Sequence, residues 1–554
     1  MLSHLRRVLY QFPLRNVTPV NRMAYMGLLR FQNVAVVKQL KKAIIRDHIA
    51  EAKTAPAYKH IWKGCKSFDH ADLPVVNKSS LHVGFPELID RLPGNITLAE
   101  FRTMNILKTS GSTTGVPSAI PVSEKDIMMT RNYYSILASI SNGLFPTKYW
   151  YLNLFPIVNS STGVMSEQIV PDEFRLGRSN ADPIKAVNII QEAMDNKKLF
   201  KSSLIIGGLP ILHLELINHL KKTGNTTMLK YLHGNAICLY GGESPTVTEK
   251  LQMYQYYKQV ISVYGSTELG PRLGFSSEVN MVIDLVFENS EILKQIDPHA
   301  TNSPCTFMYD GYLNHFEVIE GSLVNTPIIP QTEPKIKWDQ DDYSKLKNPG
   351  EIINILKSNQ EEIYKMLGEK DAKYGTKLSS VFREMLNKDG KYSRLIDYYG
   401  IMLFYGRKGI LYGGANLDGV FANNVFNDLK AEYKEIDHFA LYKSVNHDEK
   451  TELSSKSYSG LRLDILIDGR MGTEMKYDKL KERVVECLRK HHSEFDKIYS
   501  YYEHLNEVDT VKSNIKLWVF NGNSPMHDRS LKSAKRNFIV KDIDKKYSKL
   551  AIIV

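Results

Sequence analysis

The sequence predicts an α/β fold with a large N-terminal domain of mixed sheets and covering helices, followed by a small α+β domain. Three observations predict it. The chain has 554 residues, several times the length of a typical single domain. Short apolar runs bounded by glycine or proline alternate with amphipathic stretches, as strands alternate with the helices that cover them. A second alternation of strand and helix then begins just after residue 407.

The individual elements follow from these patterns. Strands of the large domain are expected at 149–155, 203–206 and 237–240, and helices at 35–53, 183–196, 210–222 and 246–257. From about 276 to 330 short strands such as 306–309 and 315–319 follow one another closely, which favours an antiparallel or mixed part of the sheet. In the small domain we expect a strand at 461–467 and a helix at 477–492.

We therefore predict domains at 1–407 and 408–554. A charged stretch rich in tyrosine and lysine, 343–395, has helical periodicity but little to bury. We interpret it as a helical insertion in the first domain.

Composition limits the partners. The net charge of +11 suits anionic ligands such as nucleotides or coenzyme A, but 72 basic against 61 acidic residues is a mild excess, so nucleic acid is not expected. The four cysteines are far apart and form no metal-ligand spacing, which favours a reducing compartment, the cytoplasm, without a zinc site. No apolar run reaches 18 residues, so no membrane span is expected.

The N-terminus is basic. Residues 1–46 contain no Asp or Glu but nine Lys and Arg. Transit peptides and helices that lie on membrane surfaces share this composition. The alternative is a basic amphipathic helix packed on its own domain.

A run of hydroxyl residues and glycines follows a strand-like segment. Glycines let the backbone approach an anion closely, and hydroxyls add hydrogen-bond donors without bulk, so the run is a candidate phosphate cradle. It is not a Walker loop, and a flexible linker is the alternative. The run consists of Thr109, Ser110, Gly111, Ser112, Thr113, Thr114 and Gly115.

Two later segments add candidate ligands. Tyr264, Gly265, Ser266, Thr267 and Glu268 combine a ring that can stack on a base, hydroxyls for a phosphate and a carboxylate for Mg²⁺. Upstream, a turn follows an apolar strand and precedes a helix, the position at which open α/β sheets hold ligands. A simple capped helix start is the alternative for that turn. Its residues are Gly241, Gly242, Glu243 and Ser244.

Taken together and in this order, the segments resemble the adenylate-forming superfamily of acyl-coenzyme A synthetases, peptide-synthetase adenylation domains and luciferases. Within it the chain is most similar to phenylacetate-coenzyme A ligases and plant hormone amido synthetases. The resemblance implies that the run 109–115 binds the phosphates of ATP and that the turn 241–244 borders adenine. It also implies that Tyr264 stacks on the base, Thr267 contacts a phosphate and Glu268 binds Mg²⁺.

The resemblance extends to the C-terminal half. The family's ribose-binding aspartate corresponds to Asp342, although Lys337 and Trp338 stand where the family has Arg and Tyr. A Gly-Arg pair before a mobile C-terminal domain corresponds to Gly406 and Arg407, which implies that Arg407 contacts the ribose. The family's last lysine, which neutralises charge during adenylation, corresponds to Lys532 or Lys535.

The implied reaction is attack by a carboxylate on the α-phosphorus of ATP, release of pyrophosphate, and transfer of the acyl group from AMP to an amine or a thiol. The run 109–115 has one more residue than the common form and is followed by Ser118 where a lysine is usual, as in the amido synthetases. This favours amide formation. A coenzyme A ligase, with coenzyme A as co-substrate, is one alternative, and a non-catalytic relative that binds nucleotide or acyl-adenylate is another.

Overall fold

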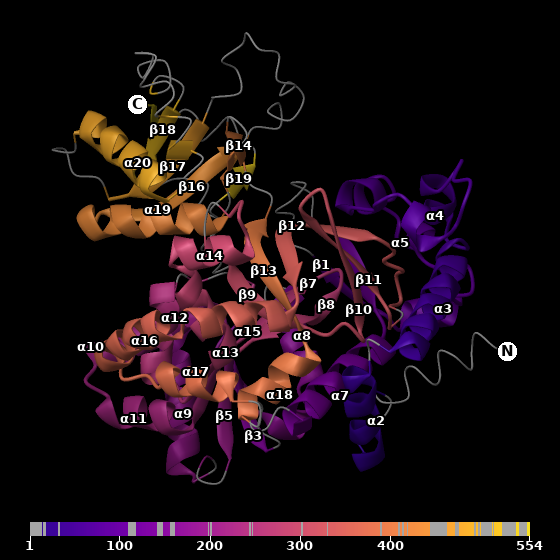
Figure 1. Ribbon diagram of the computed structural model, residues 1–554, viewed down its shortest axis with the longest axis horizontal. Helices are drawn as coiled ribbons and strands as arrows, with labels where there is room; N and C mark the ends of the chain where they lie inside the picture. Colours follow the sequence, from indigo (N-terminus) through magenta and orange to yellow (C-terminus); the bar gives the residue numbers. More distant parts are fainter. Residues whose placement is uncertain are drawn as a thin grey trace. The chain divides into compact units, whose positions relative to one another are not determined.

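The computed structural model describes two compact units of the chain (Figure 1). One unit comprises Met1–Glu243, Val247–Val286 and Cys305–Phe404, and the other comprises Ser244–Thr246, Phe287–Pro304 and Tyr405–Val554. The described residues are 14, 18–541 and 551–553, except 32–33, 109–117, 141–147, 156–160, 198, 200–201, 243–244, 246, 301–302, 330, 388–389, 408–409, 413–414, 418, 444–462, 471–475, 492–494, 497–498, 500–511, 513–514 and 523–538.

A long mixed sheet organises the first unit. Among the described residues it has eleven strands, in the order β10 (Asn314–Ile319), β11 (Ser322–Pro327), β12 (Trp338–Lys347), β13 (Gly400–Arg407), β9 (Cys305–Tyr309), β8 (Gly270–Ser276), β7 (Gln259–Ser266), β6 (Ala236–Gly241), β5 (Ser203–Gly208), β3 (Tyr149–Asn153) and β4 (Arg175–Arg178). The neighbouring strands β4, β3, β5, β6 and β7 run parallel to one another, and β8 is antiparallel to β7. Strands β5, β6 and β7 are buried along most of their length, which explains why they read as continuous apolar runs.

The expected strands and helices of this parallel part are confirmed. The connecting helices are α9 (Pro183–Asp195), α10 (Pro210–Lys222), α11 (Thr226–Asn235) and α12 (Val247–Tyr256). Helix α9 shows why the sequence marks its start. The Asp182 side chain accepts hydrogen bonds from the backbone N–H groups of Ile184 and Lys185, and Pro183 occupies the first helical position.

Two expectations need correction. The region 276–330 is mixed, as expected, but it also contains helices α13 (Glu278–Phe287) and α14 (Ser290–Ile296).

The region 343–395 begins as strand β12, and its helices are α15 (Pro349–Ser358), α16 (Gln360–Tyr374), α17 (Leu378–Leu386) and α18 (Lys391–Tyr398). The expectation that it has little to bury was wrong, because Ile352, Leu367 and Phe382 are among its fully buried side chains. Apolar residues spaced widely among charges still form one stripe on each helix.

The N-terminal part of the first unit is helical and leads to a β-hairpin. Its elements are α2 (Pro19–Arg30), α3 (Ala35–Ala52), α4 (Pro56–Ile61), η1 (His70–Asp72), η2 (Ser79–Val83), α5 (Leu88–Arg91), α6 (Leu98–Arg102), β1 (Asn105–Lys108) and β2 (Ala119–Val122), followed by α7 (Glu124–Ile140) and α8 (Ser161–Ile169). None of the described helices is both long enough and apolar enough to cross a bilayer.

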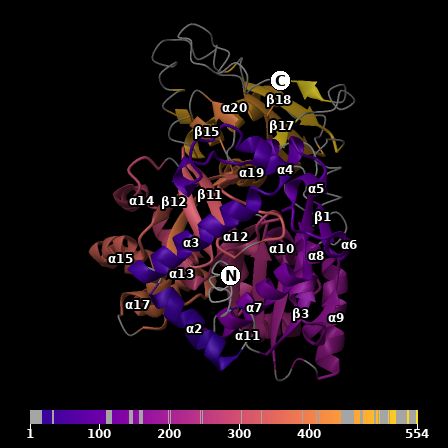
Figure 2. The same ribbon diagram turned by 90° about the vertical axis from the view of Figure 1, so that its right-hand side faces the viewer.

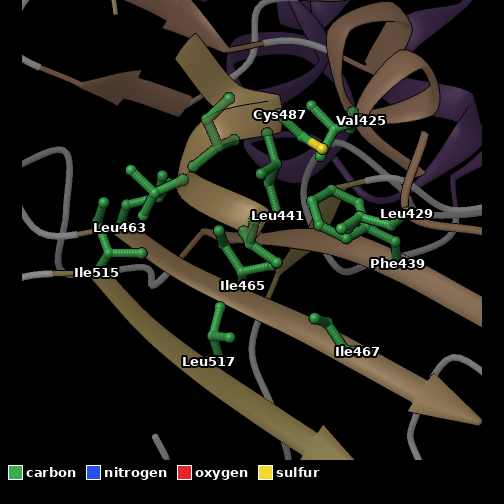
Figure 3. Packing of buried hydrophobic residues seen from close by; sticks show 14 of the residues in the cluster. Val425, Leu429, Phe439, Leu441, Leu463, Ile465, Ile467, Cys487, Ile515 and Leu517 are labelled. Atoms are coloured by element: carbon green, nitrogen blue, oxygen red, sulfur yellow. The ribbon is translucent and has the colours of Figure 1, made fainter. Parts of the chain in front are cut away.

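The second unit contains the expected C-terminal α+β arrangement. Its sheet has the order β19 (Ile539–Lys541), β16 (Ile436–Lys443), β17 (Leu463–Gly469), β18 (Ile515–Phe520) and β20 (Ile552–Ile553), with helices α19 (Gly419–Glu432) and α20 (Tyr477–His491) and a hairpin of β14 (Ile410–Tyr412) and β15 (Ala415–Leu417). Aliphatic side chains of the central strands, such as Leu441 and Ile465, pack against Val425 and Cys487 of the two helices (Figure 3).

Candidate active site

The run 109–115 connects the two strands of the β1–β2 hairpin. The run itself lies outside the described residues, but both of its ends are fixed, because Lys108 pairs with Ala119 in an antiparallel register. The Arg91 guanidinium also donates a hydrogen bond of 2.7 Å to the Ala119 carbonyl. The hairpin therefore holds the candidate phosphate-binding run between two defined points.

Tyr264 and Asp342 meet although 78 positions separate them. The Tyr264 hydroxyl donates a hydrogen bond to Asp342 Oδ2 and lies 3.4 Å from Gln340 Oε1. Tyr264 is 8% exposed and Asp342 is 4% exposed. The Tyr264 ring also contacts Phe307 and Phe404, with centroids 5.2 and 5.3 Å away. The resemblance implies that both residues contact the same nucleotide, ATP, and the fold puts them in direct contact.

Glycines allow the backbone around Tyr264 to pack tightly. A Cβ atom at Gly265 would lie 2.5 Å from Pro271 Cα and 2.6 Å from the Gly270 carbonyl oxygen, so only glycine fits inside the turn that joins β7 to β8. A Cβ at Gly241 would lie 2.9 Å from the Val263 carbonyl oxygen. Both glycines are needed for the chain to turn beside Tyr264, whatever ligand the turn meets.

Thr267 and Glu268 occupy that turn and line a small pocket of about 40 Å³, room for a few water molecules. The pocket walls come from the end of the β1–β2 hairpin, from α7 and α8, and from the loop before β12. The lining residues are Ile120, Pro121, Val122, Asp126, Ile127, Thr130, Met165, Ile169, Thr267, Glu268, Gly270, Arg272, Gln331 and Glu333. The lining combines aliphatic side chains with the charged side chains of Asp126, Glu268, Arg272 and Glu333.

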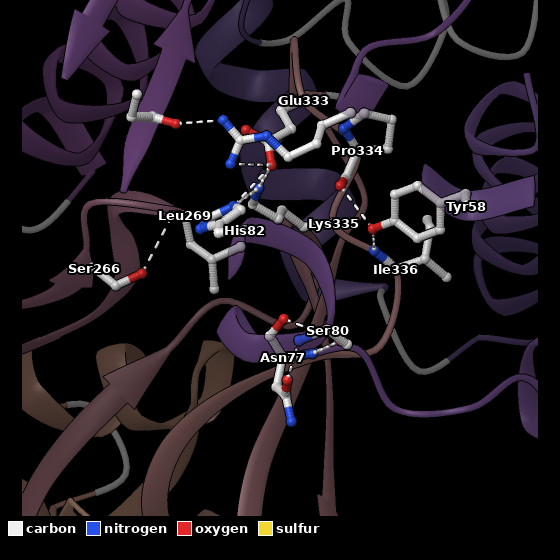
Figure 4. Close-up of polar contacts among 12 residues, drawn as sticks. Tyr58, Asn77, Ser80, His82, Ser266, Leu269, Glu333, Pro334, Lys335 and Ile336 are labelled. Carbon is white, nitrogen blue, oxygen red and sulfur yellow. Dashed lines mark hydrogen bonds and ion pairs between the residues drawn. The ribbon is translucent and has the colours of Figure 1, made fainter. Parts of the chain in front are cut away.

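A buried cluster of charges, which sequence reasoning missed, supports this pocket (Figure 4). Glu333 Oε1 lies 2.5 Å from Lys335 Nζ, 2.8 Å from His82 Nε2 and 3.9 Å from an Arg91 guanidinium nitrogen. The four side chains are 2% exposed or less. We call this group the Glu333 cluster. Its members come from η2, from α5 and from the loop before β12, so no spacing in the sequence signals it.

Electrostatics within the Glu333 cluster favour an ionised carboxylate. Burial alone raises the pKa of Glu333, but Lys335, His82 and Arg91 together lower it to about 2. Burial and the neighbouring Lys335 lower the pKa of His82 to about 4, so the imidazole is neutral at pH 7. The second carboxylate oxygen, Glu333 Oε2, is buried and has no hydrogen-bond partner.

Arg272 is a second charged residue that the sequence did not reveal. It is 7% exposed, lines the pocket, and makes no side-chain hydrogen bond to any described residue. Burial lowers the pKa of Arg272, and the negative charge of Asp126 opposes that shift. The Asp126 carboxylate is itself engaged, because it accepts hydrogen bonds from Ser123 and Thr332. A buried guanidinium that makes no side-chain hydrogen bond to the described residues is suited to bind an anion.

The remaining predicted residues divide into two groups. The first group is described: Gly241 ends β6 and is followed by Gly242, and Gly265 and Ser266 end β7. Arg407 ends β13, and its side chain is not described. Those that lie outside the described residues are Thr109, Ser110, Gly111, Ser112, Thr113, Thr114, Gly115, Glu243, Ser244, Lys532 and Lys535.

Away from the pocket, one group of described side chains has the spacing of metal ligands: His70, His315 and Glu317. His70 Nδ1 lies 3.7 Å from Glu317 Oε2, and the two imidazole rings are 4.9 Å apart. Burial and the positive charges of Lys41 and Lys337 lower the pKa of both histidines. The same two ammonium groups oppose the binding of a cation there.

Comparisons with known proteins were made at three levels. No family model matches the sequence, and a search of curated proteins found no match. Solved structures do match. A 2-hydroxyisobutyryl-CoA ligase in complex with R3-HIB-AMP has a TM-score of 0.51 at 12% identity, covering 93% of this chain and 91% of that one. A GH3.15 acyl acid amido synthetase has a TM-score of 0.50 at 11% identity, covering 97% of this chain and 98% of that one. The chain has the fold of adenylate-forming enzymes.

The Glu333 cluster leads to a prediction about stability. We expect Glu333→Gln to lower the free energy of unfolding by about 3–5 kcal/mol, because it leaves Lys335 and Arg91 buried without a counter-ion. Urea unfolding followed by circular dichroism measures this change.

Glu291→Gln is the matched control. It removes the carboxylate of an exposed pair, Lys294–Glu291 at 3.1 Å, and should change stability by no more than about 1 kcal/mol. Equal effects of the two substitutions would mean that the buried carboxylate does not hold the cluster together.

Proposed function

We propose that this protein is an adenylate-forming ligase, which converts a carboxylic acid and ATP into an acyl-adenylate and pyrophosphate and then transfers the acyl group to an amine or a thiol. The hydrogen bond between Tyr264 and Asp342 is the observation that carries the proposal. It joins the segment expected at the adenine to the residue expected at the ribose, 78 positions further along the chain.

Each predicted residue has its own part in the proposed binding of ATP. Thr267 and the run 109–115 would contact phosphates. Asp342 would accept hydrogen bonds from ribose hydroxyls, and Arg407 would assist it. Stacking of adenine on Tyr264 requires the ring to give up part of its contact with Phe307 or Phe404. Such a site accelerates phosphoryl chemistry mainly by positioning the reactants and neutralising charge.

The carboxylates at the pocket fit a magnesium ion. Glu268 makes no hydrogen bond to a described residue, and Glu333 Oε2 is an unpartnered oxygen on the same pocket. Carboxylate oxygens are the ligands that Mg²⁺ prefers. Glu268 would hold the ion, which when bound neutralises charge on the phosphates.

The acceptor is an amine in our proposal. The form of the run 109–115 and the amido synthetase among the similar structures support this choice. The similarity to a CoA ligase supports a thiol acceptor as the second candidate, with coenzyme A as co-substrate. Four free cysteines, three of them buried, support a reducing compartment such as the cytoplasm.

Pyrophosphate release tests the proposal. With ATP, Mg²⁺ and a panel of carboxylic acids, we expect acid-dependent pyrophosphate from the wild-type protein and a loss of roughly 100-fold or more in Glu268→Gln, because the substitution removes a charge that holds the metal. The exposed Glu361→Gln, on α16, is the control and should keep full activity.

The products distinguish the candidates. Mass spectrometry after addition of amino acids or coenzyme A identifies an amide or a thioester. Nucleotide binding without acid-dependent pyrophosphate from any acid would instead identify a non-catalytic binding protein.

Arg272 is our candidate for binding the substrate carboxylate. It lines a pocket that also has aliphatic side chains, and a charge-assisted hydrogen bond contributes about 1.5–3 kcal/mol. We therefore expect Arg272→Gln to raise KM for the acid roughly 10- to 100-fold while KM for ATP changes little. Arg272→Lys keeps the charge and should recover part of the affinity. An unchanged KM for the acid would refute this assignment.

The two C-terminal lysines are tested as a pair. We expect one of Lys532→Ala and Lys535→Ala to abolish adenylation, since only one ammonium group can meet the reacting oxygens, and the other to retain activity near that of the wild type. Pyrophosphate release measures both. Full activity in both variants would remove the lysine assignment without affecting the role of Glu268.

A further inference from the structure

Helix α2 is apolar on its solvent side as well as its inner side. Tyr25 and Leu29 are buried against the first unit. On the other side, Val20 is 63% exposed, Met23 is 74% exposed and Met26 is 41% exposed. A helix on the surface of a soluble domain normally turns polar side chains to water. The outer side of α2 therefore has the character of a contact surface.

Exposed apolar side chains also occur between α2 and α3 and in the first turn of α3. Phe31, Val34 and Val36 are 53%, 48% and 76% exposed. Of the fifteen large apolar side chains that are exposed among the described residues, six lie between residues 20 and 36, so they form a concentration rather than a scatter. We call Val20, Met23, Met26, Phe31, Val34 and Val36 the N-terminal apolar face.

A row of positive charges borders this face. Lys38, Lys42 and Arg46 are all exposed and lie four residues apart on α3, so they follow one side of the helix. Arg30, at the end of α2, is exposed as well. No Asp or Glu occurs before Asp47. Figure 2 turns α2 and α3 toward the viewer and shows that both run along the same side of the first unit.

We propose that the N-terminal apolar face and its basic row bind the surface of an anionic lipid bilayer. Exposed apolar side chains enter the boundary between headgroups and acyl chains, while lysines and arginines pair with anionic headgroups. A second copy of the chain fits less well, because a symmetric contact through this face would bring the basic row against itself. The proposal does not depend on the proposed ATP chemistry.

Sedimentation with lipid vesicles tests the proposal on the full chain. Vesicles of phosphatidylcholine with about one-third phosphatidylserine should bind the protein at low salt, and vesicles of phosphatidylcholine alone should bind it far less. Each cation near an anionic surface contributes roughly a five-fold gain in binding. The triple variant Lys38→Gln, Lys42→Gln, Arg46→Gln should therefore bind about 100-fold more weakly.

The apolar side chains are tested separately. Met23→Gln with Met26→Gln removes two exposed side chains from α2 and should weaken binding at least about ten-fold, because less apolar surface enters the bilayer. Ile184→Gln, at a residue 56% exposed on α9, is the control and should bind like the wild type.

A second control tests whether vesicle binding depends only on the net charge of the chain. Lys357→Gln, Lys365→Gln, Lys373→Gln removes three exposed charges from α15 and α16 and should bind like the wild type. Thermal unfolding checks that every variant is folded.

Three results would overturn the proposal: no sedimentation with either vesicle at low salt, equal weakening by the two triple variants, or loss of a dimer in the methionine variant without any vesicle binding. The last result would identify the face as a surface for self-association.

Discussion

The ionised carboxylate of Glu333 is the constraint on which the candidate site depends. It neutralises the ammonium of Lys335 and lies within ion-pair distance of Arg91, and the desolvation of three such charged groups would otherwise oppose folding. Arg91 in turn holds the Ala119 carbonyl at the start of β2. A single buried carboxylate thus links the loop before β12 to the hairpin that frames the run 109–115. Tyr58 adds to this order, because its hydroxyl donates to the Pro334 carbonyl at 2.8 Å and fixes the same loop (Figure 4).

The pocket lies at the carboxyl end of β7, the last of the parallel strands. The chain reverses from β7 into β8 through the turn that carries Thr267 and Glu268. Open α/β sheets hold ligands outside the carboxyl ends of their parallel strands. Gly265 permits the tight turn, and the Tyr264 ring fills the space beside it. Side chains that the sequence separates widely can then meet over this end of the sheet.

The two similar structures illustrate how far a fold defines a reaction. One is an acid–CoA ligase and the other is an acyl acid amido synthetase, and each extends over more than nine-tenths of this chain. Because one architecture serves both acceptors in these two similar structures, the fold by itself does not distinguish an amine from a thiol. In this chain the feature that bears on that choice is local, the length of the run 109–115.

The sequence by itself predicted most elements of the parallel part of the sheet and the candidate ligand segments. Helices such as α9 carry their own start signals, and buried parallel strands such as β5 read as apolar runs, so local patterns sufficed. The Tyr264 segment and Asp342 were recognisable for the same reason, because each lies within a short motif. Only the tertiary structure decided that these two residues touch, that Glu333 lies against Lys335, Arg91 and the neutral His82, that Arg272 borders the pocket, and that one side of α2 is apolar and exposed. Contacts between segments far apart depend on packing, and burial depends on what the rest of the chain covers, so neither leaves a periodic signal in the sequence.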